Sequence, residues 1–103
     1  MSEDKENLLA KLMNEIDVAK WDLLAPHHER EALFVVNKSL ELPPVGLAMT
    51  RDEVEYVRNW LTAGDIYQPT EEQIAVWKEE EVKFKYLIVQ PYVLAQLVNE
   101  ELQ

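Results

Sequence analysis

Two short segments with the same pattern place strong limits on how this chain folds. In Thr50–Glu53 (TRDE) and Thr70–Gln73 (TEEQ), a threonine is followed three residues later by Glu or Gln. This combination is typical of a capping box, because the threonine side chain accepts an N–H of the first helical turn while the Glu or Gln accepts the threonine N–H. An apolar stripe containing one tryptophan, Trp60 or Trp77, follows each segment. The pattern divides the second half of the chain into helix, short strand, helix and strand.

The first half of the chain begins with an apolar pattern of helical spacing. We expect a helix over Asp4–Ile16, with acidic residues near its start, where the helix dipole favours them. A second, short helix is expected at Trp21–Ala25, with Asp17 as a plausible cap. Pro26 cannot lie deep in that helix without kinking it, so the helix either ends near Leu24 or restarts at the proline.

A hairpin is expected next. Ala32–Val36 is rich in β-branched and aromatic residues, which is typical of a buried strand. Residues 37–39 indicate a turn, and Leu40–Met49 is interpreted as the returning strand. Since the pair Pro43-Pro44 cannot donate to a sheet ladder, this strand would need a bulge or a place at the sheet edge.

The helix after Thr50 is expected to end at Gly64, a residue suited to a left-handed C-terminal position. Asp65–Gln68 then predicts a short strand. The helix after Thr70 is expected to turn Ile74 and Trp77 inward. Its Glu-rich end lies at the unfavourable pole of the dipole, so we expect it to fray.

A strand over Val82–Gln90 and a terminal helix complete the prediction. Pro91 ends the strand and suits the first turn of a helix reaching about Glu100. The fold class is therefore α+β: a small mixed four-stranded sheet with N-terminal helices, two capped helices and a C-terminal helix. We expect residues 1–103 to form a single domain, with the helices mainly on one face of the sheet.

Composition restricts the classes of partner. The formal net charge is −10, which disfavours nucleic acid and anionic lipid, because phosphate binding needs clustered Lys and Arg. Cys is absent, so neither disulfides nor thiolate metal sites form. No stretch approaches the roughly 20 apolar residues of a membrane span, and the acidic N-terminus is unlike a secretory signal. We therefore expect a cytoplasmic protein with no nucleic-acid or membrane partner.

Several short segments occur in an order typical of one small protein family. They are Ala19-Lys20-Trp21, Ser39-Leu40 before Glu41-Leu42, Trp60–Gly64, Thr70–Gln73 with Trp77 after it, and Val89–Leu94. With these segments the chain resembles the bacterial family named domain of unknown function 2288, from about Leu8 to Leu97. It departs from the family at Pro43-Pro44 and at Tyr92, where Trp is usual. The resemblance implies a small cytosolic bacterial protein, and it implies no activity, cofactor or catalytic residue.

The chain carries few residues suited to chemistry. His27–Glu31 holds both histidines, and on a helix His27 and Glu31 would share one face. Zinc usually needs three protein ligands, so a third would have to come from a distant carboxylate or a second subunit. A solvated turn is the preferred interpretation. There is no G-x-S-x-G segment, and two glycines are too few for a phosphate-binding loop. We expect no catalytic residue, metal or cofactor.

Aromatic and apolar content exceeds what one small core encloses. The chain has three Trp and four Tyr, and such side chains are enriched at protein interfaces when they stay partly exposed. We expect core packing for at least two of the tryptophans, and an exposed aromatic patch involving Tyr56, Trp60 or Tyr92. The segment Pro91–Leu102 is a second candidate, because its apolar residues exceed one helical face and such a surplus often marks self-association.

The leading hypothesis is a non-enzymatic module that docks a protein partner or itself. Its candidate interaction residues are Tyr56, Trp60, Tyr92, Leu94, Leu97 and Val98. The alternative is a small ligand-binding protein or enzyme with a pocket between sheet and helices, using Asp65, Tyr67, His27-His28 or Tyr86. A third interpretation, a mimic of nucleic-acid charge, would need carboxylates spaced along one face.

Overall fold

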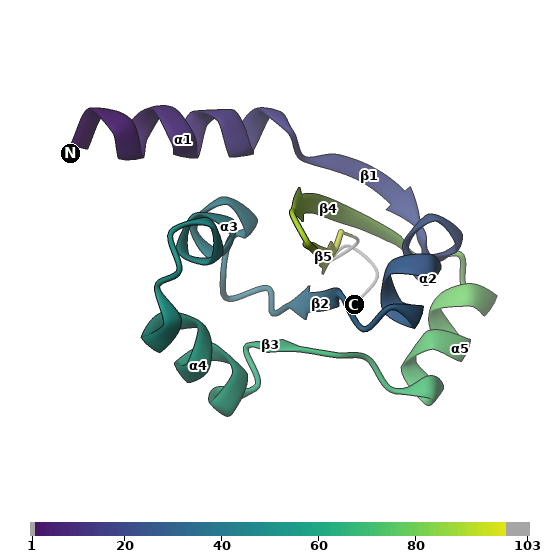
Figure 1. The fold of residues 1–103 in the computed structure, drawn as a ribbon. Helices are drawn as coiled ribbons and strands as arrows, with labels where there is room; N and C mark the ends of the chain where they lie inside the picture. The colour runs from purple at the N-terminus through teal and green to yellow at the C-terminus, as the bar shows by residue number, and fades with distance from the viewer. Residues whose placement is uncertain (1, 99–103) are drawn as a thin grey trace.

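The computed structural model describes the backbone of residues 2–98, shown in Figure 1. The elements in chain order are α1 (Ser2–Asn14), β1 (Asp17–Lys20), α2 (Trp21–Glu29), β2 (Leu33–Val36), α3 (Leu42–Thr50), α4 (Val54–Ala63), β3 (Ile66–Tyr67), α5 (Glu71–Glu79), β4 (Lys83–Val89) and β5 (Tyr92–Leu97). The predicted α+β class is confirmed, with five helices.

The sheet is mixed, as predicted, but it has five strands rather than four. The strand order is β1-β4-β5-β2-β3. β5 runs parallel to β2 and antiparallel to β4, while β1 and β3 pair antiparallel at the two edges. Three of the four predicted strands are present as β2, β3 and β4. The fourth is a helix, and β1 and β5 were not predicted.

Helices cover both faces of the sheet, so the expectation that they lie mainly on one face is wrong. In Figure 1, α1, α3 and α4 lie on one side of the central strands, and α2 and α5 lie on the other. Successive strand residues point to opposite faces. Leu87 of β4 therefore packs in a cluster with α1 and α3, whereas Phe84 of the same strand packs in a cluster with α2 and α5.

The predicted strand at Leu40–Met49 is instead the helix α3. Its two prolines lie in the first helical turn, where their missing N–H groups would have no intrahelical partner in any case. Gly46 allows α3 to lie close against β4, because a Cβ at this position would be 2.9 Å from the Leu87 side chain. The apolar run that suggested a strand is buried because the helix is covered on several sides.

The two capping segments have different outcomes. Thr70 forms the predicted capping box: its Oγ1 accepts the Gln73 N–H at 3.1 Å, and Gln73 Oε1 accepts the Thr70 N–H at 3.0 Å. Thr50 does not cap a helix, because it is the last residue of α3. The following helix α4 begins after Glu53, whose side chain makes no capping hydrogen bond.

The predicted C-terminal helix is also wrong. A turn with a cis Gln90–Pro91 peptide bond joins β4 to β5, and β5 is a central strand between β4 and β2. Val93, Leu94 and Ala95 are all buried, because both faces of this strand are covered. β-Branched and apolar residues suit such a strand. The part of the predicted helix beyond Val98 lies outside the described residues.

Near the start of the chain, the strand β1 lies between α1 and α2, where no strand was predicted. Asp17 does not cap α2; it is the first residue of β1, and its Oδ1 accepts the Val18 N–H at 2.8 Å. Lys20 is the residue before the helix. α2 continues through Pro26 to Glu29, so the proline neither ends nor restarts it.

Four helices end in the same way, with one residue in the left-handed conformation. Gly64 has φ 82°, as predicted. In each case the next residue donates its N–H to a carbonyl five residues earlier, the 6→1 bond of the Schellman motif. The left-handed residues are Glu31 after α2, Asp52 after α3, Gly64 after α4 and Glu81 after α5. Three of these ends carry acidic residues, so they give no glycine signal in the sequence.

Candidate functional site

Helix α4 carries several exposed apolar side chains. None of its ten residues is buried. Val57 and Trp60 pack only partly against the core, and Tyr56 on the same helix is 60% exposed. Val54 and Leu61 are also exposed. Apolar side chains at this spacing normally lie against a core, so α4 presents an apolar surface that the described chain leaves partly uncovered.

A groove of about 250 Å3 lies between α3 and α4 and is called the α3–α4 groove here. Its walls are mainly apolar and come from α3, α4, β2 and β5. The lining residues are Phe34, Ala48, Met49, Asp52, Glu53, Val54, Val57, Leu61 and Tyr92. Asp52 and Glu53 belong to the turn between the two helices, so two acidic residues line the groove where the helices meet.

A second groove of about 290 Å3, called the Trp60 groove, lies between α4, α3 and α1. Tyr56 and Trp60 line it, and their ring centroids are 6.1 Å apart. Leu9 of α1 and Pro44 of α3 contribute apolar surface. This groove shares Ala48 and Glu53 with the α3–α4 groove, so the two meet at the junction of α3 and α4.

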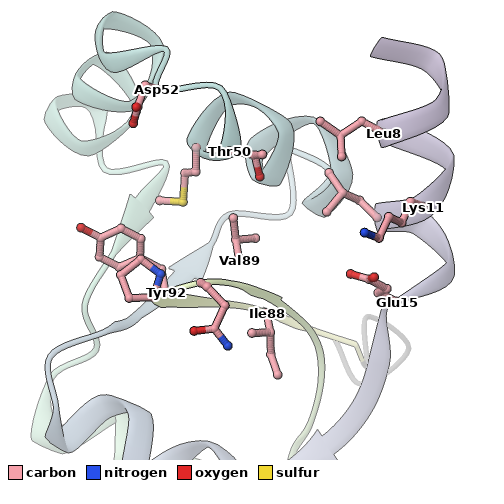
Figure 2. A pocket seen from close by; sticks show the side chains of 12 residues that line it. Leu8, Lys11, Glu15, Thr50, Asp52, Ile88, Val89 and Tyr92 are labelled. Atoms are coloured by element: carbon pink, nitrogen blue, oxygen red, sulfur yellow. The ribbon is translucent and has the colours of Figure 1, made fainter. Parts of the chain in front are cut away.

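A larger hollow of about 410 Å3, called the Tyr92 hollow, lies between α1, the α3–α4 turn and the β4–β5 turn. Figure 2 shows Lys11 and Glu15 of α1 on one side, and Tyr92 and Asp52 on the other. Met49, Asp52 and Tyr92 also line the α3–α4 groove. The three concave regions therefore form one connected surface around the α3–α4 turn.

The structure brings together three of the six predicted interaction residues. Tyr56 and Trp60 line the Trp60 groove, and Tyr92, which is 40% exposed, lines the other two regions. Leu94 has no exposed surface, so it cannot take part in an interface. Leu97 and Val98 are half-buried at the end of β5 and do not line these grooves.

Sequence reasoning missed the contribution of α3 to this surface. Met49 and Pro44 line the grooves, but the sequence interpretation placed both in a strand. The proline pair was the available signal, because two consecutive prolines suit a helical first turn better than a sheet. Val54 and Leu61 lie on the apolar stripe that contains Trp60, and their exposure was not foreseen.

The residues proposed for a ligand pocket do not gather at the Tyr92 hollow. Tyr67 and Tyr86 pack against the cluster on the α2–α5 face, and burial raises the pKa of Tyr67 despite an opposing hydrogen bond with Gln73. The Asp65 carbonyl accepts the Asn37 N–H at 2.7 Å. Asp65, Tyr67 and Tyr86 line none of the three concave regions.

The histidine pair is not arranged as a metal site. The Nδ1 atom of His27 contacts the guanidinium of Arg30, and His28 packs beside the ring of Trp21 at 5.6 Å. α2 ends at Glu29, so Glu31 does not lie one helical turn beyond His27. Among the side chains described, those of residues 7–98, no group of three or more His, Asp or Glu is placed to hold a metal ion.

This architecture defines a small α+β protein with an apolar surface around the turn between two helices. The chain belongs to the family described as "Protein of unknown function (DUF2288)", whose pattern matches residues 7–97. A solved relative, "NMR solution structure of PA1075 from Pseudomonas Aeruginosa", is 32% identical. The alignment covers 98% of this chain and 94% of that chain, with a TM-score of 0.78. No curated protein matches the chain.

The family identification confirms the resemblance inferred from the sequence. It assigns no activity, so the function has to be argued from the site. Of the helices described within residues 2–98, none combines the length and apolar character needed to span a bilayer.

Proposed function

We propose that this protein is a non-enzymatic docking module that binds a protein partner through the surface around α4. The observation that carries the proposal is that α4 has an apolar stripe but no buried residue. Helices in small proteins are stabilised mainly by burying such a stripe. A partner that covers Val54, Tyr56 and Leu61 would complete the burial that the chain itself leaves incomplete.

The side chains at this surface suit an interface. Tyr56, Trp60 and Tyr92 are large aromatic residues, the types enriched among the side chains that dominate binding energy. Each combines a wide apolar area with one polar group and only two rotatable bonds, so little conformational entropy is lost on binding. The grooves beside these rings offer concave surface into which side chains of a partner can insert.

The proposal is tested by placing a photo-crosslinking amino acid at Tyr56 in the protein expressed in cells. The matched control carries the same amino acid at Val76 of α5, which is 51% exposed on the other side of the sheet. We expect discrete adducts with another protein at position 56 and not at position 76. Leu61→Ser should remove those adducts, because it places a hydroxyl on the apolar stripe.

Circular dichroism and urea unfolding of Leu61→Ser are needed beside this experiment. Leu61 is 45% exposed, so we expect its substitution to change stability by no more than about 1 kcal/mol. Adducts that form equally at both positions, or that survive Leu61→Ser, would show that α4 is not a docking surface.

A second candidate function is binding of a small ligand in the Tyr92 hollow. Its volume of about 410 Å3 falls within the range of ligand sites, and Lys11, Thr50 and Gln90 supply polar groups around an apolar base. A set of small soluble compounds added to 15N-labelled protein tests it. Saturable shifts at Lys11 and Gln90 would favour a ligand site, and shifts spread over the whole surface would exclude it.

A further inference from the structure

The α3–α4 groove combines apolar walls with two acidic residues where the helices meet. Its apolar lining includes Met49, Val57 and Leu61, and the carboxylates of Asp52 and Glu53 lie at the turn. Of the residues that line it in the described chain, none is Lys or Arg. A ligand that filled only the apolar part of the groove would offer no positive charge to these two acidic residues.

The negative charge of the groove is only weakly compensated nearby. Arg51 Nε lies 3.8 Å from Glu53 Oε2, at the outer limit of an ion pair, and both side chains are well exposed. Pairs of this kind contribute about 0–1 kcal/mol. The chain as a whole carries a formal net charge of −10, which makes the electrostatic potential around the groove more negative.

We infer that the occupant of the α3–α4 groove is an apolar segment of a partner protein that carries a Lys or Arg side chain. This inference rests on the proposed docking function and specifies the chemistry of the partner. The apolar side chains lie between α3 and α4, and the cation lies beside Asp52 and Glu53. Tyr92 on the same groove offers an aromatic face, which also attracts cations.

Charge argues against a second copy of this chain as the occupant. Each copy carries a formal net charge of −10, so association brings two strongly negative molecules together. A second copy could present Arg58 of its own α4, but it would bring ten surplus negative charges with it. A basic partner gains from the same field in both the rate and the specificity of association.

The test uses a phage-displayed library of random 12-residue peptides selected on the whole protein. We expect enriched peptides to contain apolar residues together with Lys or Arg. A synthetic peptide from the selection is then titrated into the protein by fluorescence anisotropy. Its affinity should fall at least fivefold between about 50 mM and about 500 mM salt, since exposed charges are screened over this range.

Two variants with the same change in charge locate the cation. Asp52→Asn with Glu53→Gln removes both carboxylates of the groove, and Asn tolerates the left-handed conformation of position 52. Glu79→Gln with Glu80→Gln removes two exposed carboxylates at the end of α5. We expect about a threefold to tenfold weaker affinity for the first variant, and a change below twofold for the second.

The outcomes separate this inference from the proposed function. Enriched peptides that lack Lys and Arg, yet lose affinity on Leu61→Ser, would overturn the basic partner and keep the docking surface. An equal loss in both charge variants would show only a long-range field and would overturn the placement at the groove. Peptides unaffected by Leu61→Ser would overturn both proposals. If sedimentation velocity showed a dimer that Leu61→Ser dissociates, a second copy would be the occupant instead.

Discussion

Helices α4 and α5 share a sequence pattern but have different environments. Each follows a T-x-x-E or T-x-x-Q segment, and each carries one tryptophan on an apolar stripe. Trp77 of α5 is 6% exposed, whereas α4 has no buried residue at all. An apolar stripe therefore shows which side of a helix avoids water, but not whether the chain itself supplies the cover.

Aromatic side chains of neighbouring elements pack against Trp77 and bury the apolar stripe of α5. The rings of Trp77 and Phe84 meet edge to face at 5.1 Å, and the rings of Trp77 and Trp21 lie 5.6 Å apart. Such pairs add about 0.5–1.5 kcal/mol to the energy of burial. Trp60 has a different neighbour, the exposed ring of Tyr56. The stripe of α5 is thus buried among aromatic rings, while α4 leaves part of its apolar stripe exposed.

The largest expected effect is on the α5 side of this comparison. Trp77→Ala should lower the free energy of unfolding by about 3–5 kcal/mol, because it opens a cavity among Trp21, Phe84 and Val82. Trp60→Ala should cost less than half as much, since its side chain is only partly covered. Urea unfolding followed by far-UV circular dichroism measures both. Equal losses would mean that α4 belongs to the core as firmly as α5 does.

The next test compares the two threonines. Thr70→Ala should lower stability by about 1 kcal/mol, because it removes the acceptor of the Gln73 N–H. Thr50→Ala should change stability by less than about 0.5 kcal/mol, since Thr50 is an exposed residue at the end of α3. Both variants are measured by urea unfolding. A loss of about 1 kcal/mol at Thr50 would contradict its assignment as a residue that caps no helix.

The fold was predictable where a local signal was distinct. The capping box marked α5, the apolar stripe and Gly64 marked α4, and β-branched runs or flanking turn residues marked β2–β4. α3 and β5 were misassigned because each is an apolar segment covered on several sides. Periodicity does not separate a buried helix from a buried strand in such segments. Prolines misled both assignments, because Pro43 and Pro44 lie in the first turn of a helix, whereas Pro91 lies in a hairpin turn and begins no helix.

The candidate site was predictable only in part, for a related reason. Tyr56, Trp60 and Tyr92 were selected by residue type, and all three line the connected grooves. Leu94 was selected for apolar surplus on an expected helix, but as a strand residue it points into the core. Exposure depends on pairing partners far along the chain, such as β2 beside β5, and no local pattern contains that information.

A smaller effect is expected at the end of α4. Gly64 has φ 82°, and no atom lies within 4 Å of the position a Cβ would occupy. Gly64→Ala should therefore lower stability by about 1 kcal/mol through backbone strain alone. Glu81 holds the equivalent position after α5 with φ 50°. An unchanged urea midpoint for Gly64→Ala would show that α4 can end without the left-handed residue.

The smallest expected effect concerns an exposed ion pair near the end of α5. Lys20 Nζ donates to Glu81 Oε1 at 2.8 Å and joins the end of β1 to the residues after α5. This hydrogen bond lowers the pKa of Glu81 below its ordinary value of 4.5 and raises the pKa of Lys20 above 10.5. Its contribution to stability is therefore fully present between these two ordinary values. It is lost as pH falls through the lowered pKa of Glu81, or rises through the raised pKa of Lys20.

Replacing the lysine tests this pH dependence. In Lys20→Met, the carboxyl pKa of Glu81, followed by NMR titration, should return toward its ordinary value. The urea midpoint should fall slightly below wild type near pH 7, and the difference should shrink as pH falls through the lowered pKa of Glu81. Lys85→Met, at an exposed lysine on β4, is the matched control and should leave the Glu81 titration unchanged. A Glu81 pKa equally low in Lys20→Met would mean that the pair does not form in solution, and that α5 depends on its aromatic contacts and its cap alone.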